Sequence, residues 1–219
     1  YLLITSLCIV AIISTSFIKN DNQKKVNKAK MLTEIKDVFV ILRNNNLLMT
    51  LLFLALVTTL LSMPTRTLFA PYASESLSGG PLQVGLMLAA IGSGALTGSL
   101  LAASLPQNSK KGKFLLGTSV LSGLAILILG FSTLTLFSIF LCFFLGLGDA
   151  GRRSLSPSML IEKTPPEYRG RVMGIYSMNF GFIPLGAIPM GIIADKFGVS
   201  ISFIAAGIML ILLMFLADL

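Results

Sequence analysis

Long apolar stretches without charged residues divide this sequence into segments long enough to cross a membrane. Residues 1–18 form one such run, residues 19–46 are polar and basic, and apolar runs recur from Leu47 to the end. A helix needs about 20 mostly apolar residues to cross the hydrocarbon core of a bilayer. Residues 114–148 carry no charge but are too long for one crossing. The small residues at 130–133 therefore predict a turn between two spans.

The pattern predicts an all-α membrane fold: a partial helix, a cytoplasmic linker and a bundle of six transmembrane helices. The partial helix covers residues 1–18, the linker 19–46 and the six-helix domain 47–219. Since Tyr1 begins within an apolar run, with no basic segment before it, we interpret the sequence as a fragment that starts inside a helix. The predicted spans are about 47–73, 83–105, 113–131, 135–160, 171–194 and 199–217.

The linker contains an apolar pattern of its own. Met31, Ile35, Val38 and Leu42 recur at helical spacing, and the charged residues lie off this stripe. The spacing predicts an amphipathic helix on the inner membrane surface or against the bundle. The alternative is a solvated linker without that helix.

Lysine and arginine are distributed unevenly among the predicted loops. Of the 17 basic residues, 13 lie in the loops 19–46, 106–113 and 162–171, and Lys196 alone lies in a loop on the other side. Cytoplasmic loops of membrane proteins carry an excess of lysine and arginine. The asymmetry therefore predicts that these three loops face the cytoplasm, and it indicates a multi-pass protein of the plasma (inner) membrane surrounded by lipid.

Composition and missing motifs exclude several other classes of protein. Charged residues make up 12% of the chain, about half the share in soluble domains. The net charge of +8 is explained by the cytoplasmic loops, and no compact basic domain suggests nucleic-acid binding. With no histidine, two cysteines in apolar runs and no phosphate-binding loop, the sequence predicts no catalytic site, metal site or cofactor. We therefore expect that the chain is not an enzyme.

Three charged residues lie close together within one predicted span. Asp149, Arg152 and Arg153 are spaced i, i+3 and i+4, so they share one helix face. Ionisable groups in a membrane span are costly and mark substrate or ion pathways by default. We predict that they line a substrate cavity. The alternative is an Asp149–Arg153 pair that satisfies only itself, with Arg152 extending toward the cytoplasm.

A fourth charge, Arg66, follows Pro64 in the first full span. Proline removes a backbone donor and disturbs the preceding turn, and such breaks can line binding sites in transporters. We therefore predict that Arg66 belongs to the cavity or to an outer gate. The alternative is an anchor at the membrane interface.

The motifs of this chain resemble the C-terminal half of a major facilitator superfamily transporter. The resemblance is closest to the branch that includes the enterobactin and macrolide exporters, and it covers the end of helix six through helix twelve. It rests on GLGDAGRR at 146–153, PPEYRGRVMG at 165–174, PLG at 184–186, GIIADKFG at 191–198 and the Pro-broken span followed by a Gly-rich one at 63–98.

The resemblance implies a partner, an activity and a gate. The partner is the N-terminal half of the same transporter, and the activity is export of a small amphipathic or anionic molecule by alternating access with proton antiport. Arg169 and Arg171 would form an inner gate, with Glu162 and Glu167 as local counter-charges. The alternative is that both arginines only anchor the loop on the cytoplasmic side. A second alternative for the whole chain is a non-transporting membrane module, either a sensor or a domain fused to a membrane enzyme.

Glycines recur along two of the predicted spans. Gly94 and Gly98 form a G-x-x-x-G step, and Gly186 and Gly191 lie on the fifth full span. Small residues let membrane helices approach closely, so we predict that these four pack helices together. Direct contact with substrate is the alternative.

Overall fold

The computed structural model describes residues 5, 9, 14, 45–106 and 111–217. The chain divides into two units, Tyr1–Asp37 and Val38–Leu219, and the fold described below belongs to the second. The predicted amphipathic helix at 31–42 lies outside the described residues, and so does most of the predicted partial helix at 1–18.

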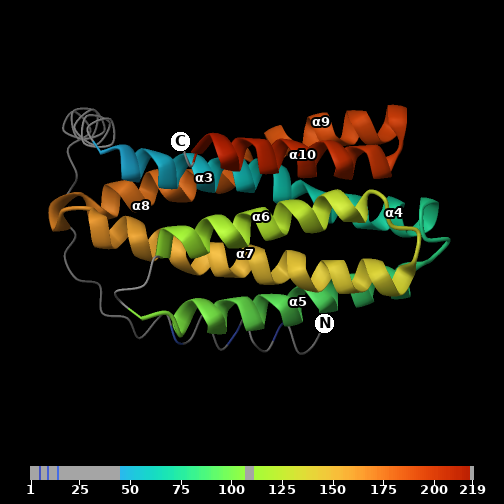
Figure 1. The fold of residues 1–219 in the computed structure, drawn as a ribbon, viewed down its shortest axis with the longest axis horizontal. Helices are drawn as coiled ribbons and strands as arrows, with labels where there is room; N and C mark the ends of the chain where they lie inside the picture. The colour runs from blue at the N-terminus through green and yellow to red at the C-terminus, as the bar shows by residue number, and fades with distance from the viewer. Residues whose placement is uncertain (1–4, 6–8, 10–13, 15–44, 107–110, 218–219) are drawn as a thin grey trace. The chain divides into compact units, whose positions relative to one another are not determined.

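All regular elements in the described part of the chain are helices (Figure 1). The longer ones are α3 (Asn46–Ser62), α5 (Pro81–Ala103), α6 (Lys111–Leu129), α7 (Thr135–Lys163), α9 (Ile183–Phe197) and α10 (Val199–Ala217). The shorter ones are η1 (Pro64–Leu68), α4 (Phe69–Glu75), η2 (Pro166–Tyr168), α8 (Arg169–Met178) and η3 (Asn179–Phe182), where η marks a 3-10 helix.

Six helical segments in the described residues are long and apolar enough to cross a membrane, which confirms the predicted all-α, six-helix architecture. The turn predicted at 130–133 is present, since α6 ends at Leu129 and α7 begins at Thr135. The six segments are Asn46–Glu75, Pro81–Ala103, Lys111–Leu129, Thr135–Lys163, Pro166–Phe197 and Val199–Leu216.

The first span is broken at the proline that the sequence singles out. α3 ends at Ser62, and Pro64 opens the 3-10 helix η1. Because proline has no N–H to donate, carbonyl groups in the turn before it lose a partner. Two threonine hydroxyls supply donors here: Thr65 Oγ1 donates to the Ser62 carbonyl at 2.6 Å, and Thr67 Oγ1 donates to the Pro64 carbonyl at 2.7 Å.

Glycine packs α5 directly against α7, which lies between α5 and α6 (Figure 1). A Cβ atom added at Gly94 or Gly98 would collide with a carbonyl oxygen of α7, and one added at Gly146 of α7 would collide with the Ile91 carbonyl of α5. Backbone therefore lies on backbone along this interface, as the G-x-x-x-G step predicts.

The two glycines of α9 have different surroundings among the described residues. A Cβ at Gly186 of α9 would collide with the Leu60 carbonyl of α3, so α9 approaches α3 closely there. A Cβ at Gly191 would meet no heavy atom of the described residues within 4 Å. Five residues beyond Gly186, Gly191 is turned away from α3 by the helical repeat, so it packs no helix within the described bundle.

At the end of the bundle where α6 turns into α7, one hydroxyl group ties three helices together. Tyr72 of α4 is fully buried. Its hydroxyl lies 2.8 Å from the Leu129 carbonyl oxygen, 3.0 Å from the Ser132 carbonyl oxygen and 3.1 Å from the Ser138 hydroxyl. Phe203 of α10 packs on the Tyr72 ring with the ring centroids 5.0 Å apart.

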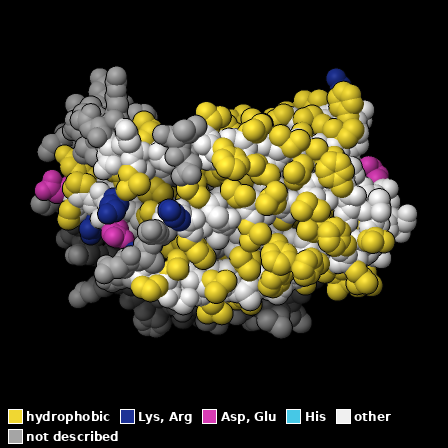
Figure 2. Space-filling view, in the orientation of Figure 1, with side chains coloured by type: hydrophobic (Ala, Val, Ile, Leu, Met, Phe, Trp, Pro, Cys, Tyr) yellow, Lys and Arg dark blue, Asp and Glu magenta, His cyan; other side chains and the backbone are white. Residues whose placement is uncertain are grey.

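The outer surface of the bundle suits a hydrocarbon environment. Figure 2 shows apolar side chains over the middle of the visible face, with charged side chains toward its two ends. Leu136 is 84% exposed and Leu82 is 72% exposed. Such exposure would be costly in water, but it is expected for side chains that face lipid.

Candidate functional site

Asp149 lies midway along α7 and is 2% exposed. Its two carboxylate oxygens accept hydrogen bonds from three side chains. Ser62 Oγ lies 2.9 Å from Oδ1 and 3.0 Å from Oδ2, Arg66 Nη2 lies 3.2 Å from Oδ2, and Arg152 Nη2 lies 3.0 Å from Oδ1. The donors come from α3, η1 and α7, so the carboxylate joins the broken first span to α7.

The local sequence explains how these donors reach one carboxylate. Arg152 follows Asp149 by three residues and lies on the same face of α7. Ser62 ends α3, and Arg66 lies in η1 just after Pro64. The structure therefore brings together two regions that the sequence analysis treats as separate candidates, Arg66 and the charges of α7.

Arg153 does not form the ion pair with Asp149 that the alternative interpretation of the sequence assigned to it. The buried partner of Asp149 on α7 is Arg152, which is 5% exposed. Arg153 Nη2 instead donates to Met63 Sδ at 3.2 Å, and its guanidinium carbon lies 5.9 Å from the centroid of the Phe180 ring. The correction has a geometric reason: the next position around the helix turns Arg153 toward η3, whose aromatic face attracts a cation.

Positive charge is in excess at this site. Arg66, Arg152 and Arg153 carry three positive charges against the single negative charge of Asp149, which gives +2 for the group. Two donor nitrogens of the group, Arg152 Nη1 and Arg66 Nε, are buried with no hydrogen-bond partner among the described residues. A buried donor without a partner costs about 1–3 kcal/mol. The group is therefore chemically suited to bind a further acceptor or anion.

A small cavity lies beside the two arginines of α7. Its lining includes Arg152, Arg153, Ser156, Tyr176 and Phe180. The space available to water centres is about 10 Å³, enough for about one water molecule. The described residues therefore leave room for no more than about one water molecule beside these two arginines.

Four members of the site were not predicted from the sequence: Ser62, Ser156, Tyr176 and Phe180. Ser156 follows Arg152 by four residues, so helical spacing from the charged face would have found it. Tyr176 is a polar side chain inside an apolar span, which is a usable signal. Ser62 gives none, because serines within membrane spans commonly bond their own helix backbone.

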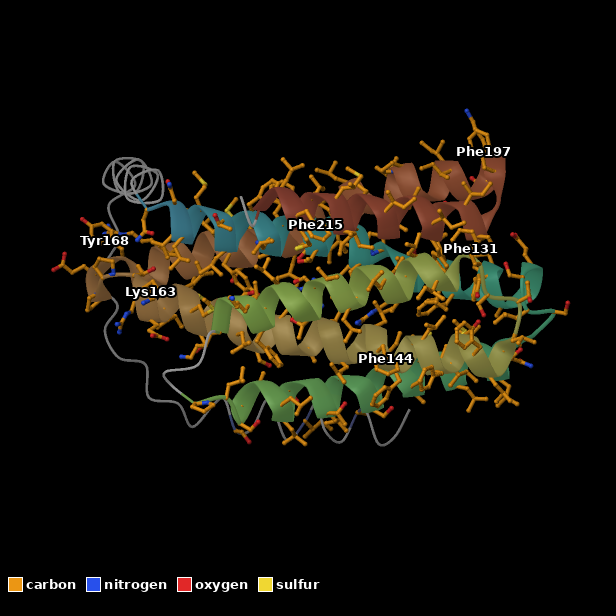
Figure 3. All side chains as sticks on the ribbon, viewed as in Figure 1. Phe131, Phe144, Lys163, Tyr168, Phe197 and Phe215 are labelled. Atoms are coloured by element: carbon orange, nitrogen blue, oxygen red, sulfur yellow. The ribbon has the colours of Figure 1, made fainter. Side chains whose placement is uncertain are left out.

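The predicted inner-gate residues gather at one end of the bundle, where Lys163 and Tyr168 also lie (Figure 3). Glu162 does not balance the loop arginines by an ion pair of its own, because it pairs with Lys111 Nζ of α6 at 2.9 Å. Arg169 Nε donates to the Thr164 carbonyl at 3.2 Å, and the Arg171 guanidinium carbon lies 5.4 Å from the Tyr168 ring centroid.

Metal binding finds no support in the described part of the chain. No group of three or more histidine, cysteine, aspartate or glutamate side chains there is arranged to hold a metal ion. Cys142 is buried in the core of the bundle.

Comparisons with known proteins point to one family. A family model described as "Transmembrane secretion effector" matches residues 2–218. Macrolide efflux protein A of Streptococcus pyogenes is 26% identical over 181 residues, and its counterpart in a serotype M6 strain gives the same values. The match covers 81% of this chain and 45% of the relative, so the chain spans less than half the length of the curated relatives it matches. No solved structure matches.

Proposed function

Because the chain belongs to the transmembrane secretion effector family of the major facilitator superfamily, we propose that it forms the C-terminal half of a secondary-active exporter. In this proposal residues 1–18 end the sixth helix, residues 19–46 link the halves on the cytoplasmic side, and residues 47–219 form the second six-helix domain. The protein lies in the plasma membrane with loops 106–113 and 162–171 in the cytoplasm. Its partner is the N-terminal half of the same transporter.

The substrate we propose is a small amphipathic molecule with a carboxylate or another strong hydrogen-bond acceptor. The observation that carries this is the charged group around Asp149. It has a net charge of +2, and two of its buried arginine donor nitrogens have no hydrogen-bond partner in the described part of the chain. The named substrate class of the related exporter makes macrolides the first compounds to test.

The proposed binding site is made by Arg66, Arg152 and Arg153, and Asp149 positions the first two. Its carboxylate holds Arg66 and Arg152 through direct hydrogen bonds. Since the cavity beside them has room for about one water, the N-terminal half must supply the opposite wall. Export then follows from rocking of the two halves around this site, driven by proton antiport. Arg169 and Arg171 close the site from the cytoplasmic side.

The test is export by the full-length protein reconstituted in vesicles with an imposed proton gradient. Two probes are used, a radiolabelled macrolide and a fluorescent amphipathic carboxylate. We expect the unsubstituted protein to take up at least one of the two probes into inside-out vesicles. We expect Arg66→Ala and Arg153→Ala to lose transport of at least one probe. Lys196→Gln, an exposed charge of α9, is the matched control.

Three outcomes separate the parts of the proposal. Transport that is unchanged in Asp149→Asn, Arg66→Ala and Arg153→Ala refutes the site. Transport that persists when the proton gradient is collapsed refutes proton antiport. Absence of transport for every probe in a correctly folded protein supports a non-transporting membrane module instead.

A further inference from the structure

A groove separate from the Asp149 group lies at the end of the bundle where α3 and α6 begin. Its volume is about 470 Å³, and it is bounded by α3, α6 and the end of α7. Its apolar lining includes Leu47, Leu51, Leu54, Leu115, Leu116 and Met159. Its polar lining consists of Asn46, Thr50 and Lys113. None of these residues belongs to the group around Asp149.

The groove follows α3 from a polar end at Asn46 to an apolar end at Leu54. Its lining on α3 extends from Asn46 to Leu54, which corresponds to a helix rise of about 12 Å. This length is close to the depth of one leaflet, since the whole hydrocarbon core measures about 30 Å. Lys113 lies in the first turn of α6, so its charge is placed at the polar end.

Among the described residues, one lysine at this end forms no ion pair. Lys111 is paired with Glu162, but no ion pair joins Lys113 to any described carboxylate. α3 and α6 both start here, and neither has an acidic residue in its first turn. A helix N-terminus carries unpaired N–H groups and a partial positive charge, and at α3 the Asn45 side chain caps one of these groups, the Leu48 N–H. The polar end therefore attracts an anion, while the remainder of the groove favours an apolar chain.

We propose that this groove binds an anionic phospholipid. The phosphate group contacts Lys113 and the start of α3, and one acyl chain lies along Leu47, Leu51 and Leu54. The sequence analysis predicts that loop 106–113 is cytoplasmic, and the cytoplasmic leaflet is the one rich in anionic lipids. The lipid is bound, not transported, so this site is independent of the proposed export site.

The absence of tryptophan from these 219 residues allows a direct test. Leu47, 43% exposed, is replaced by tryptophan in the full-length protein, with any tryptophan outside these residues changed to phenylalanine. The protein is reconstituted in phosphatidylcholine, and tryptophan quenching is titrated with phosphatidylglycerol or phosphatidylcholine brominated on the acyl chains. We expect the apparent affinity for phosphatidylglycerol to be about fivefold higher than that for phosphatidylcholine. This ratio corresponds to about 1 kcal/mol for one lysine near an anionic headgroup.

Two variants locate the effect. Lys113→Gln should bring the ratio of the two lipids close to one, while Lys196→Gln, an exposed lysine at the end of α9, should leave it unchanged. Thr50→Phe, which fills the groove and keeps Lys113, should weaken quenching by both lipids. A general attraction of anionic lipid to the protein surface would survive Thr50→Phe and would overturn the proposal.

Two further results would also overturn it. The first is equal quenching by both lipids in the Leu47→Trp protein that carries no other change in the groove. The second is weaker quenching of the Leu47→Trp reporter by both lipids than of a Leu136→Trp reporter on the lipid-facing surface. The groove would then hold protein instead of lipid. The linker residues 31–42 or the N-terminal half would be that occupant. Since quenching does not depend on transport, failure of this proposal is distinguishable from failure of the export site.

Discussion

Neutralising Asp149 should destabilise the protein more than removing its buried arginine partner. Asp149→Asn keeps the side-chain shape but leaves Arg152, which is 5% exposed, as a buried charge without a counter-ion. Removing one partner of a buried ion pair costs about 3–5 kcal/mol of the free energy of unfolding. Arg152→Met leaves Asp149 with its bonds from Ser62 and Arg66, so we expect a smaller loss of about 1.5–3 kcal/mol, the value of one hydrogen bond to a charged group.

The double variant Asp149→Asn/Arg152→Met sharpens the prediction. It removes the buried unpaired charge, while Arg66 and Arg153 remain partly exposed. We therefore expect the double variant to be more stable than Asp149→Asn alone, so that the two changes are not additive.

The measurement is the free energy of unfolding of the full-length protein, by titration from mild detergent into sodium dodecyl sulfate with loss of helical circular dichroism. Arg153→Met is the matched control, because its guanidinium contacts Met63 and Phe180 and makes no bond to Asp149. The reasoning is refuted if Asp149→Asn is no less stable than Arg152→Met. It is also refuted if the two changes add.

Two further predictions use the same unfolding titration. Gly146→Ala should lower the free energy of unfolding by about 1–3 kcal/mol, because its Cβ meets the Ile91 backbone and forces α5 away from α7. Gly85→Ala, in open space on α5, should change it by less than about 1 kcal/mol, and an equal loss in both variants would contradict the packing argument. Tyr72→Phe should cost about 1 kcal/mol by removing a buried hydroxyl that lies 2.8 Å from the Leu129 carbonyl oxygen; no change would show that this hydroxyl is not holding the helix ends.

The topology was predictable from the sequence because its signals are local. Charge-free runs set the spans, and the turn at 130–133 follows from the length of run 114–148 together with its cluster of small residues. Gly94 and Gly98 were predictable as a packing surface for a similar reason, since their spacing puts both on one face. Gly191 shows the limit: a glycine in a span signals close packing only if the helix turns it toward a neighbour.

The partner of Asp149 was not predictable from α7 alone. Residues at i+3 and i+4 both reach a carboxylate on the same helix face. Which arginine bonds to Asp149 depends on the positions of Phe180 in η3 and Ser62 in α3. These are contacts between segments far apart in sequence, and no local pattern encodes them.

The glycine interface between α5 and α7 also bears on how such a bundle can move. Where carbonyl oxygens at Phe143, Leu147 and Ile91 lie against glycine Cα atoms, no flexible side chains separate the two backbones. Sliding one helix along the other would drive neighbouring side chains into backbone atoms. We therefore expect α5 and α7 to move together as one rigid unit. A displacement of Asp149, midway along α7, would then be transmitted to both ends of this unit. No side chain between the two backbones could absorb it by changing its rotamer. In the proposed exporter, the change of access would then take place at surfaces other than this one.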